Sequence, residues 1–209
     1  MECSNPLGFE SRAVSDAQRD GKPTRIVSGA RTFVTDTEVL WDAVTNPKKL
    51  VRWFNPIKGD LKLGGRYQLD GNAGGEITRC EQPEVFEVTW EFAENVSWLT
   101  LRLEPDGDGT RLTLEHVMTK DEASESHWSQ YGPGATGVGW DLGFLGLGLY
   151  LDIESFDRKE AEAWAASEPG KEFIRDCAKA WGTAHAASGE EADTANTMAE
   201  NTAKAYTGE

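Results

Sequence analysis

The alternation of apolar and polar residues changes several times along the chain, and each change predicts a different kind of element. Residues 25–34 alternate with the period of a strand. Residues 37–54 then place apolar side chains at helical spacing, and Asn46-Pro47 divides them into two short helices. From about residue 57 to residue 118 the period is two again, which predicts antiparallel strands joined by turns. With the first strand included, we expect about seven strands.

The last two strands are predicted most clearly, because "PDGDG" at residues 105–109 stands between two alternating runs. Glycine and aspartate tolerate the backbone dihedrals of a tight turn. On the second of these strands Leu112, Leu114, His116 and Met118 share one face. We therefore expect His116 to point inward with the leucines.

The segment after the last strand, "GVGWDLGFLGLGLYLD" at residues 137–152, predicts a helix that is apolar on almost every side, with Asp141 and Asp152 on a narrow polar line. Such a helix is buried. It is shorter than the about 20 residues of a membrane span. Each glycine costs the helix roughly 1 kcal/mol relative to alanine, so close packing against a sheet must compensate. The missing side chains serve packing alone, or they also leave room for a ligand.

The composition divides the chain into three parts. Residues 1–24 are polar and turn-rich, which predicts a flexible leader, and residues 25–153 form the predicted domain. Residues 154–209 are alanine-rich and predict a helical extension. One apolar stripe of this extension contains Phe173, Ile174, Cys177, Ala178 and Trp181. This stripe is expected to dock on its own domain, on another chain or on the opening of a pocket.

Several ordered motifs within the predicted domain resemble those of one known family. They are Trp41 in the first helix, Trp53-Phe54 after the second, Gly59 to Tyr67, and Thr89-Trp90. In this order they resemble the Aha1-like branch, named after the activator of Hsp90 ATPase, of the START-like or SRPBCC superfamily. The resemblance implies an α+β helix-grip (Bet v 1-like) fold, in which a curved antiparallel sheet surrounds a long closing helix and a pocket lies between them. It is less specific for function, because members bind ligands, catalyse cyclisation or activate Hsp90.

Charge and cysteine usage restrict the classes of partner. Thirty-six acidic residues against twenty-one basic ones give a net charge of -15, which disfavours nucleic acid and anionic membranes as partners. The three cysteines, Cys3, Cys80 and Cys177, have no metal-site spacing, and we expect neither a metal nor another cofactor. The N-terminus has no apolar segment typical of a signal peptide. We expect a cytoplasmic protein.

The candidate site residues are those expected where the sheet, the closing helix and the segment before it meet. The pocket candidates are Tyr67, Trp90, Trp98, His116, Trp128, Trp140, Gly143 and Phe144. Aromatic side chains with a polar tip suit a pocket for a flat apolar ligand, but they also suit an ordinary core. His116 is either an acid–base group or a buried imidazole with its hydrogen bonds satisfied. No nucleophile is paired with a base in the sequence, so we assign no catalytic residue.

The sequence leaves three functions open. The preferred one is binding of a small apolar or aromatic ligand in the pocket. The second is a protein-interaction module, either co-chaperone-like or a partner of a regulator, which binds a protein through residues 155–209. The third is an enzyme of the cyclase or hydrolase kind that uses the same pocket.

Overall fold

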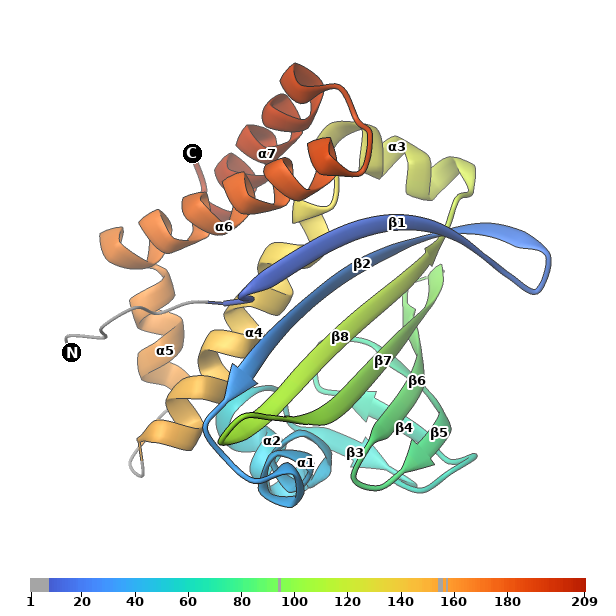
Figure 1. Ribbon diagram of the computed structural model, residues 1–209, viewed down its shortest axis with the longest axis vertical. Helices are drawn as coiled ribbons and strands as arrows, with labels where there is room; N and C mark the ends of the chain where they lie inside the picture. The colour runs from blue at the N-terminus through green and yellow to red at the C-terminus, as the bar shows by residue number, and fades with distance from the viewer. Residues whose placement is uncertain (1–7, 94, 154–155, 157) are drawn as a thin grey trace.

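One curved antiparallel sheet wraps around a long helix in the computed structural model, which describes residues 8–93, 95–153, 156 and 158–209 (Figure 1). The strands are β1 (Ser11–Arg19), β2 (Lys22–Phe33), β3 (Ile57–Gly59), β4 (Arg66–Leu69), β5 (Gly74–Glu81), β6 (Val85–Phe92), β7 (Asn95–Asp106) and β8 (Gly109–Thr119). Their order in the sheet is β1-β2-β8-β7-β6-β5-β4-β3, and every neighbouring pair is antiparallel. The helix-grip fold predicted from the sequence is confirmed, with eight strands in the described part of the chain instead of about seven.

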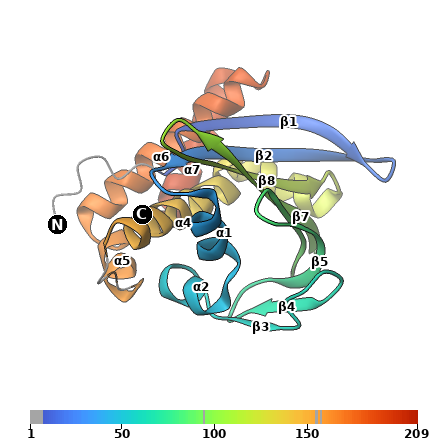
Figure 2. The same cartoon turned by 60° about the horizontal axis from the view of Figure 1, so that its bottom comes forward.

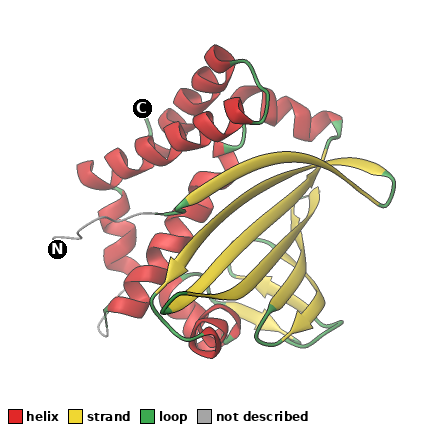
Figure 3. Ribbon diagram, in the orientation of Figure 1, coloured by secondary structure: helices red, strands yellow, loops and turns green. Residues whose placement is uncertain are grey.

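The helices cover the concave face and one edge of this sheet (Figure 3). They are α1 (Thr37–Thr45), α2 (Pro47–Trp53), α3 (Glu122–Tyr131), α4 (Gly134–Asp152), α5 (Arg158–Ala165), α6 (Glu168–Ala187) and α7 (Ala192–Thr207). The break between α1 and α2 is at Asn46, as predicted, because its side chain accepts a hydrogen bond from the Lys48 N–H and Pro47 begins the new helix. The predicted helical extension corresponds to α5, α6 and α7.

The N-terminal part of the chain corrects the prediction of a flexible leader over residues 1–24. Residues 1–7, with Cys3, lie outside the described residues, but β1 pairs with β2 over the whole length of β1. Asp20 and Gly21 form the connecting turn with φ of 52° and 74°. Positive φ at both central residues is typical of the tight hairpin turns that favour Asp-Gly. The Asp-Gly dipeptide was therefore the signal for the additional strand.

Helix α4 has neighbouring elements on several sides, which explains why its sequence is apolar almost all round (Figure 2). It contacts β2 and α2 on one side and α6 and α7 on the other. Different glycines of α4 lie against different neighbouring elements. A Cβ at Gly137 would collide with the indole of Trp181, and one at Gly146 would lie 3.1 Å from the carbonyl oxygen of Trp53. The glycines thus allow close approach to other helices, and not only to the sheet as expected from the sequence.

Asp141 does not lie on a polar line, as the sequence suggested, but is fully buried in the core. Its Oδ1 accepts hydrogen bonds from the Phe9 N–H (2.7 Å) and from Arg12 Nη2 (2.6 Å). Its Oδ2 accepts one from Trp181 Nε1 (2.8 Å). Burial raises the pKa of the Asp141 carboxyl, and these donors oppose that effect. One carboxylate thereby joins the N-terminal segment, α4 and α6.

The apolar stripe of the extension packs against the chain's own domain. Phe173, Ile174, Cys177, Ala178 and Trp181 belong to the same hydrophobic core cluster as the residues of the sheet and α4. This is the first of the three dockings expected from the sequence. The division of the chain at residues 24 and 153 stays a prediction, although one core includes residues from both sides of each boundary.

Candidate ligand-binding cavity

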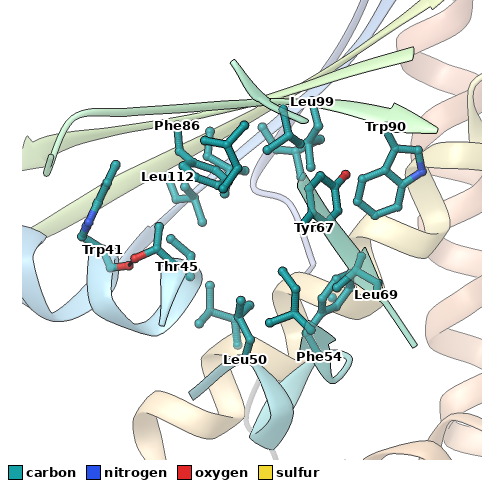
Figure 4. A pocket seen from close by; sticks show the side chains of 18 of the residues that line it. Trp41, Thr45, Leu50, Phe54, Tyr67, Leu69, Phe86, Trp90, Leu99 and Leu112 are labelled. Atoms are coloured by element: carbon teal, nitrogen blue, oxygen red, sulfur yellow. Dashed lines mark hydrogen bonds between the residues drawn. The ribbon is translucent and has the colours of Figure 1, made fainter. Parts of the chain in front are cut away.

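A cavity of about 250 Å³ lies between the concave face of the sheet and helices α1, α2 and α4. Figure 4 shows side chains from these elements arranged around an open centre. The lining is mainly apolar, and its aromatic members are Trp41, Trp53, Phe54, Tyr67, Phe86, Trp90, Trp140 and Phe144. Aliphatic side chains complete the wall on the strands and helices, among them Val44, Leu50, Leu69, Ile77, Val88, Leu99, Leu101, Leu112, Leu114 and Leu147.

One end of the cavity is formed by aromatic rings that hold one another in place. Phe54 stacks on Trp140 with a centroid distance of 6.0 Å and an interplanar angle of 20°. Trp90 meets the same indole edge to face at 5.2 Å. Offset and edge-to-face arrangements are the favourable ones for aromatic pairs. The wall therefore presents a rigid apolar surface contributed by the C-terminal end of α2 with Phe54 directly after it, by α4 and by β6.

Several polar atoms of the lining are already hydrogen-bonded within the protein. The Tyr67 hydroxyl donates to the carbonyl oxygen of Thr89 (2.8 Å), and Trp53 Nε1 donates to that of Ala43 (3.0 Å). The Thr45 hydroxyl donates to the carbonyl oxygen of Trp41 (2.7 Å). Burial raises the pKa of Tyr67, so its hydroxyl stays protonated. The cavity thus offers shape and apolar surface more than hydrogen bonds.

Gly143 is the one place on α4 where a missing side chain leaves room inside the cavity. A Cβ there would meet Trp140 at 3.9 Å and Phe54 at 4.0 Å, which are ordinary contacts. Unlike Gly137, Gly143 is therefore not required for close helix packing. This observation favours the reading, left open by the sequence, that the glycines of α4 also make space.

His116 lies behind the aromatic wall, not in the lining. Its Nδ1 accepts a hydrogen bond from Trp140 Nε1 (3.1 Å), and since an indole N–H only donates, the ring proton is on Nε2. Nε2 lies 2.8 Å from Ser97 Oγ, whose hydroxyl donates to the carbonyl oxygen of Trp90 (3.1 Å). Burial lowers the pKa of His116 to about 4. The imidazole is thus neutral near pH 7, and it positions Trp140.

The predicted site residues divide into those that line the cavity and those that do not. Tyr67, Trp90, Trp140, Gly143 and Phe144 line it. His116 faces inward, as predicted from strand parity, but contacts the cavity only through Trp140 and Trp90. That any of these residues binds a ligand stays a prediction.

Trp98 was expected in the pocket, but it does not line the cavity. Leu99 and Leu101 line the cavity from β7, so Trp98 lies on the opposite face of the sheet. There the guanidinium of Arg19 lies 4.5 Å from its ring centroid. This cation–π contact joins the N-terminal hairpin to the convex face.

Trp128 is likewise not in the cavity, because the segment before the closing helix forms a helix of its own, α3, which packs elsewhere. The Arg25 guanidinium lies 3.8 Å from the Trp128 ring centroid, and His185 meets the ring edge to face at 5.2 Å. Trp128 therefore connects α3 with β2 and α6.

Several lining residues were missed although their signal was present. Trp41 and Trp53-Phe54 were recognised only as motif residues of the first two helices. Phe86, on β6, was not among the candidates, although it alternates with Val88 and Trp90 on one face of that strand. Residues on α1 and α2 enter the site because these helices close one side of the curved sheet, an arrangement that the fold and not the local pattern provides.

Comparison with known proteins agrees with this architecture. Residues 35–150 match the family described as activator of Hsp90 ATPase homolog 1-like protein, which is more than half of the chain. The chain belongs to this family. No curated protein matches the chain.

Solved structures extend the likeness beyond the segment that matches the family. The crystal structure of CalU16 from Micromonospora echinospora is 31% identical, with a TM-score of 0.59, and the alignment covers 75% of this chain and 96% of that one. The solution structure of CalU16 is matched over 90% of this chain and all of that one, with 28% identity and a TM-score of 0.68. MLL2253 from Mesorhizobium loti shares 25% identity over 61% of this chain and 97% of that one, with a TM-score of 0.53.

The family match and the structure also give some information on a protein partner, on the membrane and on metal ions. The family name associates some Aha1-like members with Hsp90. None of the helices in the described part of the chain has the length and apolar character needed to cross a bilayer. Within those same residues, no three His, Cys, Asp or Glu side chains are grouped so that they could hold a metal ion.

Proposed function

We propose that this Aha1-like protein binds a small, uncharged apolar or aromatic molecule in the cavity. The observation that carries the proposal is an apolar space of about 250 Å³. Pockets for drug-sized ligands are about 300–1,000 Å³, and an engineered apolar cavity of about 150 Å³ binds benzene. The volume between these values suits a compound with one or two rings, or a ring with a short alkyl chain.

The chemistry of the lining supports an uncharged ligand. The lining includes one charged side chain, Lys62, which is 73% exposed and paired with Asp60 at 2.9 Å. A charged group inside the cavity would lose its hydration without gaining a partner, which is strongly unfavourable. Benzoate is therefore expected to bind at least about 100-fold more weakly than toluene.

The proposal includes no reaction and no protein partner. Among the described lining residues there is no carboxylate and no imidazole, and His116 has both ring nitrogens engaged behind Trp140. An acid–base pair for a cyclase or hydrolase is thus without support. The stripe of α6 that suggested an interaction module is used in the chain's own core.

Isothermal titration calorimetry with toluene and longer n-alkylbenzenes tests the proposal. Gly143→Leu places a side chain in the cavity and is expected to weaken binding by at least about tenfold. Gly143→Ala and Gly148→Ala form a matched pair, since each replaces a glycine of α4 where a Cβ meets only ordinary contacts, but Gly148 does not line the cavity. Only the change at Gly143 should lower affinity.

Two results would contradict the proposal. One is the absence of heat from every compound with the wild-type protein. The other is wild-type affinity in Gly143→Leu, which would place the binding elsewhere on the molecule.

A further inference from the structure

The N-terminal segment contributes a buried ring directly behind the wall of the cavity. Phe9 is 2% exposed although it precedes the first strand. Its ring lies on the backbone of Gly29 in β2, where a Cβ would collide with it. It also meets Trp181 of α6 edge to face at 5.9 Å. Phe9 therefore fills a space between the sheet and the helices that exists because Gly29 has no side chain.

This ring supports a residue that lines the cavity. The Phe9 centroid lies 4.3 Å from that of Phe144, which faces the cavity from α4. Phe33 of β2 lies 5.8 Å from the same ring. Phe144 is thus held from behind by two rings, Phe9 and Phe33, and both precede residues 35–150, the segment that matches the family.

The position of Phe9 is fixed by the buried carboxylate of α4. The Phe9 N–H and Arg12 both bond Asp141, which is in the turn of α4 immediately before Phe144. Gly8 approaches Asp141 so closely that a Cβ there would collide with the carboxylate. The backbone of this segment, and not only its side chain, is therefore anchored to the helix that carries the wall.

We infer that residues 8–12 determine the depth of the cavity, and that Phe9 is a specificity-determining residue that acts through Phe144. The inference rests on the proposed function. With Phe9 in place, Phe144 cannot move away from the cavity. Without it, the Phe144 ring gains the space of a phenyl group behind it, and the cavity accepts a longer ligand.

A series from toluene to n-octylbenzene measures this depth by calorimetry. Each methylene that fits should raise the affinity by about fourfold, until the chain exceeds the cavity and the affinity falls. In Phe9→Ala the maximum should move to a chain longer by about two methylene groups or more. Gly29→Ala should move it in the same direction, because it displaces the Phe9 ring without removing it.

Phe173→Ala is the matched control, since Phe173 is also buried but its ring packs against Trp164 of α5, with 5.8 Å between the centroids, and does not line the cavity. It should leave the maximum unchanged. If Phe9→Ala does not fold, Phe9→Leu replaces it and should shift the maximum by a smaller amount. The inference would be overturned by a folded Phe9 variant whose affinity maximum lies at the wild-type chain length, or by an equal shift of that maximum in Phe173→Ala. In both cases binding of the series by the wild-type protein would still support the proposed function. If the wild-type protein binds no member of the series, both fail.

Discussion

Replacing Arg12 by methionine is expected to destabilise the protein by about 3–5 kcal/mol at pH 7, because it leaves a buried carboxylate without its counter-ion. Asp141 has a fully buried side chain, and that of Arg12 is only 13% exposed. Nη2 of Arg12 lies 2.6 Å from Oδ1, closer than the other donors. Methionine retains most of the aliphatic packing, so the loss reports mainly on the charge.

The pH dependence of this loss distinguishes the charge from packing. Burial already raises the pKa of Asp141, and removal of the guanidinium raises it further. Because the folded pKa of Asp141 is raised in the wild type too, the two proteins differ between that value and the higher folded value of the variant, where only the folded variant holds the proton. Its stability therefore improves relative to the wild type as the pH falls, by up to about 1.4 kcal/mol per pH unit.

Urea unfolding monitored by tryptophan fluorescence at pH 7 and pH 5.5 measures both effects. Arg175→Met is the control, because Arg175 is 36% exposed and bonds Glu168 and Glu209 at the surface. It should change the free energy of unfolding by less than about 1 kcal/mol. A loss of this size in Arg12→Met, or a larger loss that does not shrink at pH 5.5, would refute the reasoning.

Two further predictions follow from the same core. Burial lowers the pKa of His116 to about 4, from about 6.5 in an unfolded chain, so the folded protein favours the neutral imidazole. The free energy of unfolding therefore falls as the pH decreases from 6.5 towards 4. The advantage of the wild type over His116→Gln in urea should therefore shrink by about 2–3 kcal/mol between pH 7 and pH 4.5, and a constant difference would contradict this. Deletion of residues 166–209 removes Trp181, which is 1% exposed and bonds Asp141, so the truncated chain should aggregate or lose its near-UV circular dichroism. A truncated protein with native circular dichroism would instead show that the extension is dispensable for folding.

The part of the fold that depends on local periodicity could be predicted from the sequence. The turn at residues 105–109 and the inward face of β8 follow from alternation, and a helix that is apolar all round had to be buried. The family motifs then supplied the curvature of the sheet and the place of the pocket. Five of the eight candidate residues consequently line the cavity.

The failures have a common physical origin in contacts between distant parts of the chain. The ion pair between Arg12 and Asp141 joins residues 129 positions apart, and no local sequence pattern predicts it. The strand β1 is mostly polar because it is an edge strand, so its composition resembles that of a flexible leader, and only the Asp-Gly turn at residues 20–21 indicates the hairpin. Trp98 and Trp128 were chosen for size, whereas parity and helix packing place them outside the cavity.

A crystal structure of the protein in complex with n-butylbenzene is the most direct test of the central claim. The account predicts electron density for the ligand between Trp140, Phe86 and Leu112, next to Gly143, with Phe144 still packed against Phe9. A cavity filled by the protein's own side chains, with the ligand bound only at the surface, would contradict it.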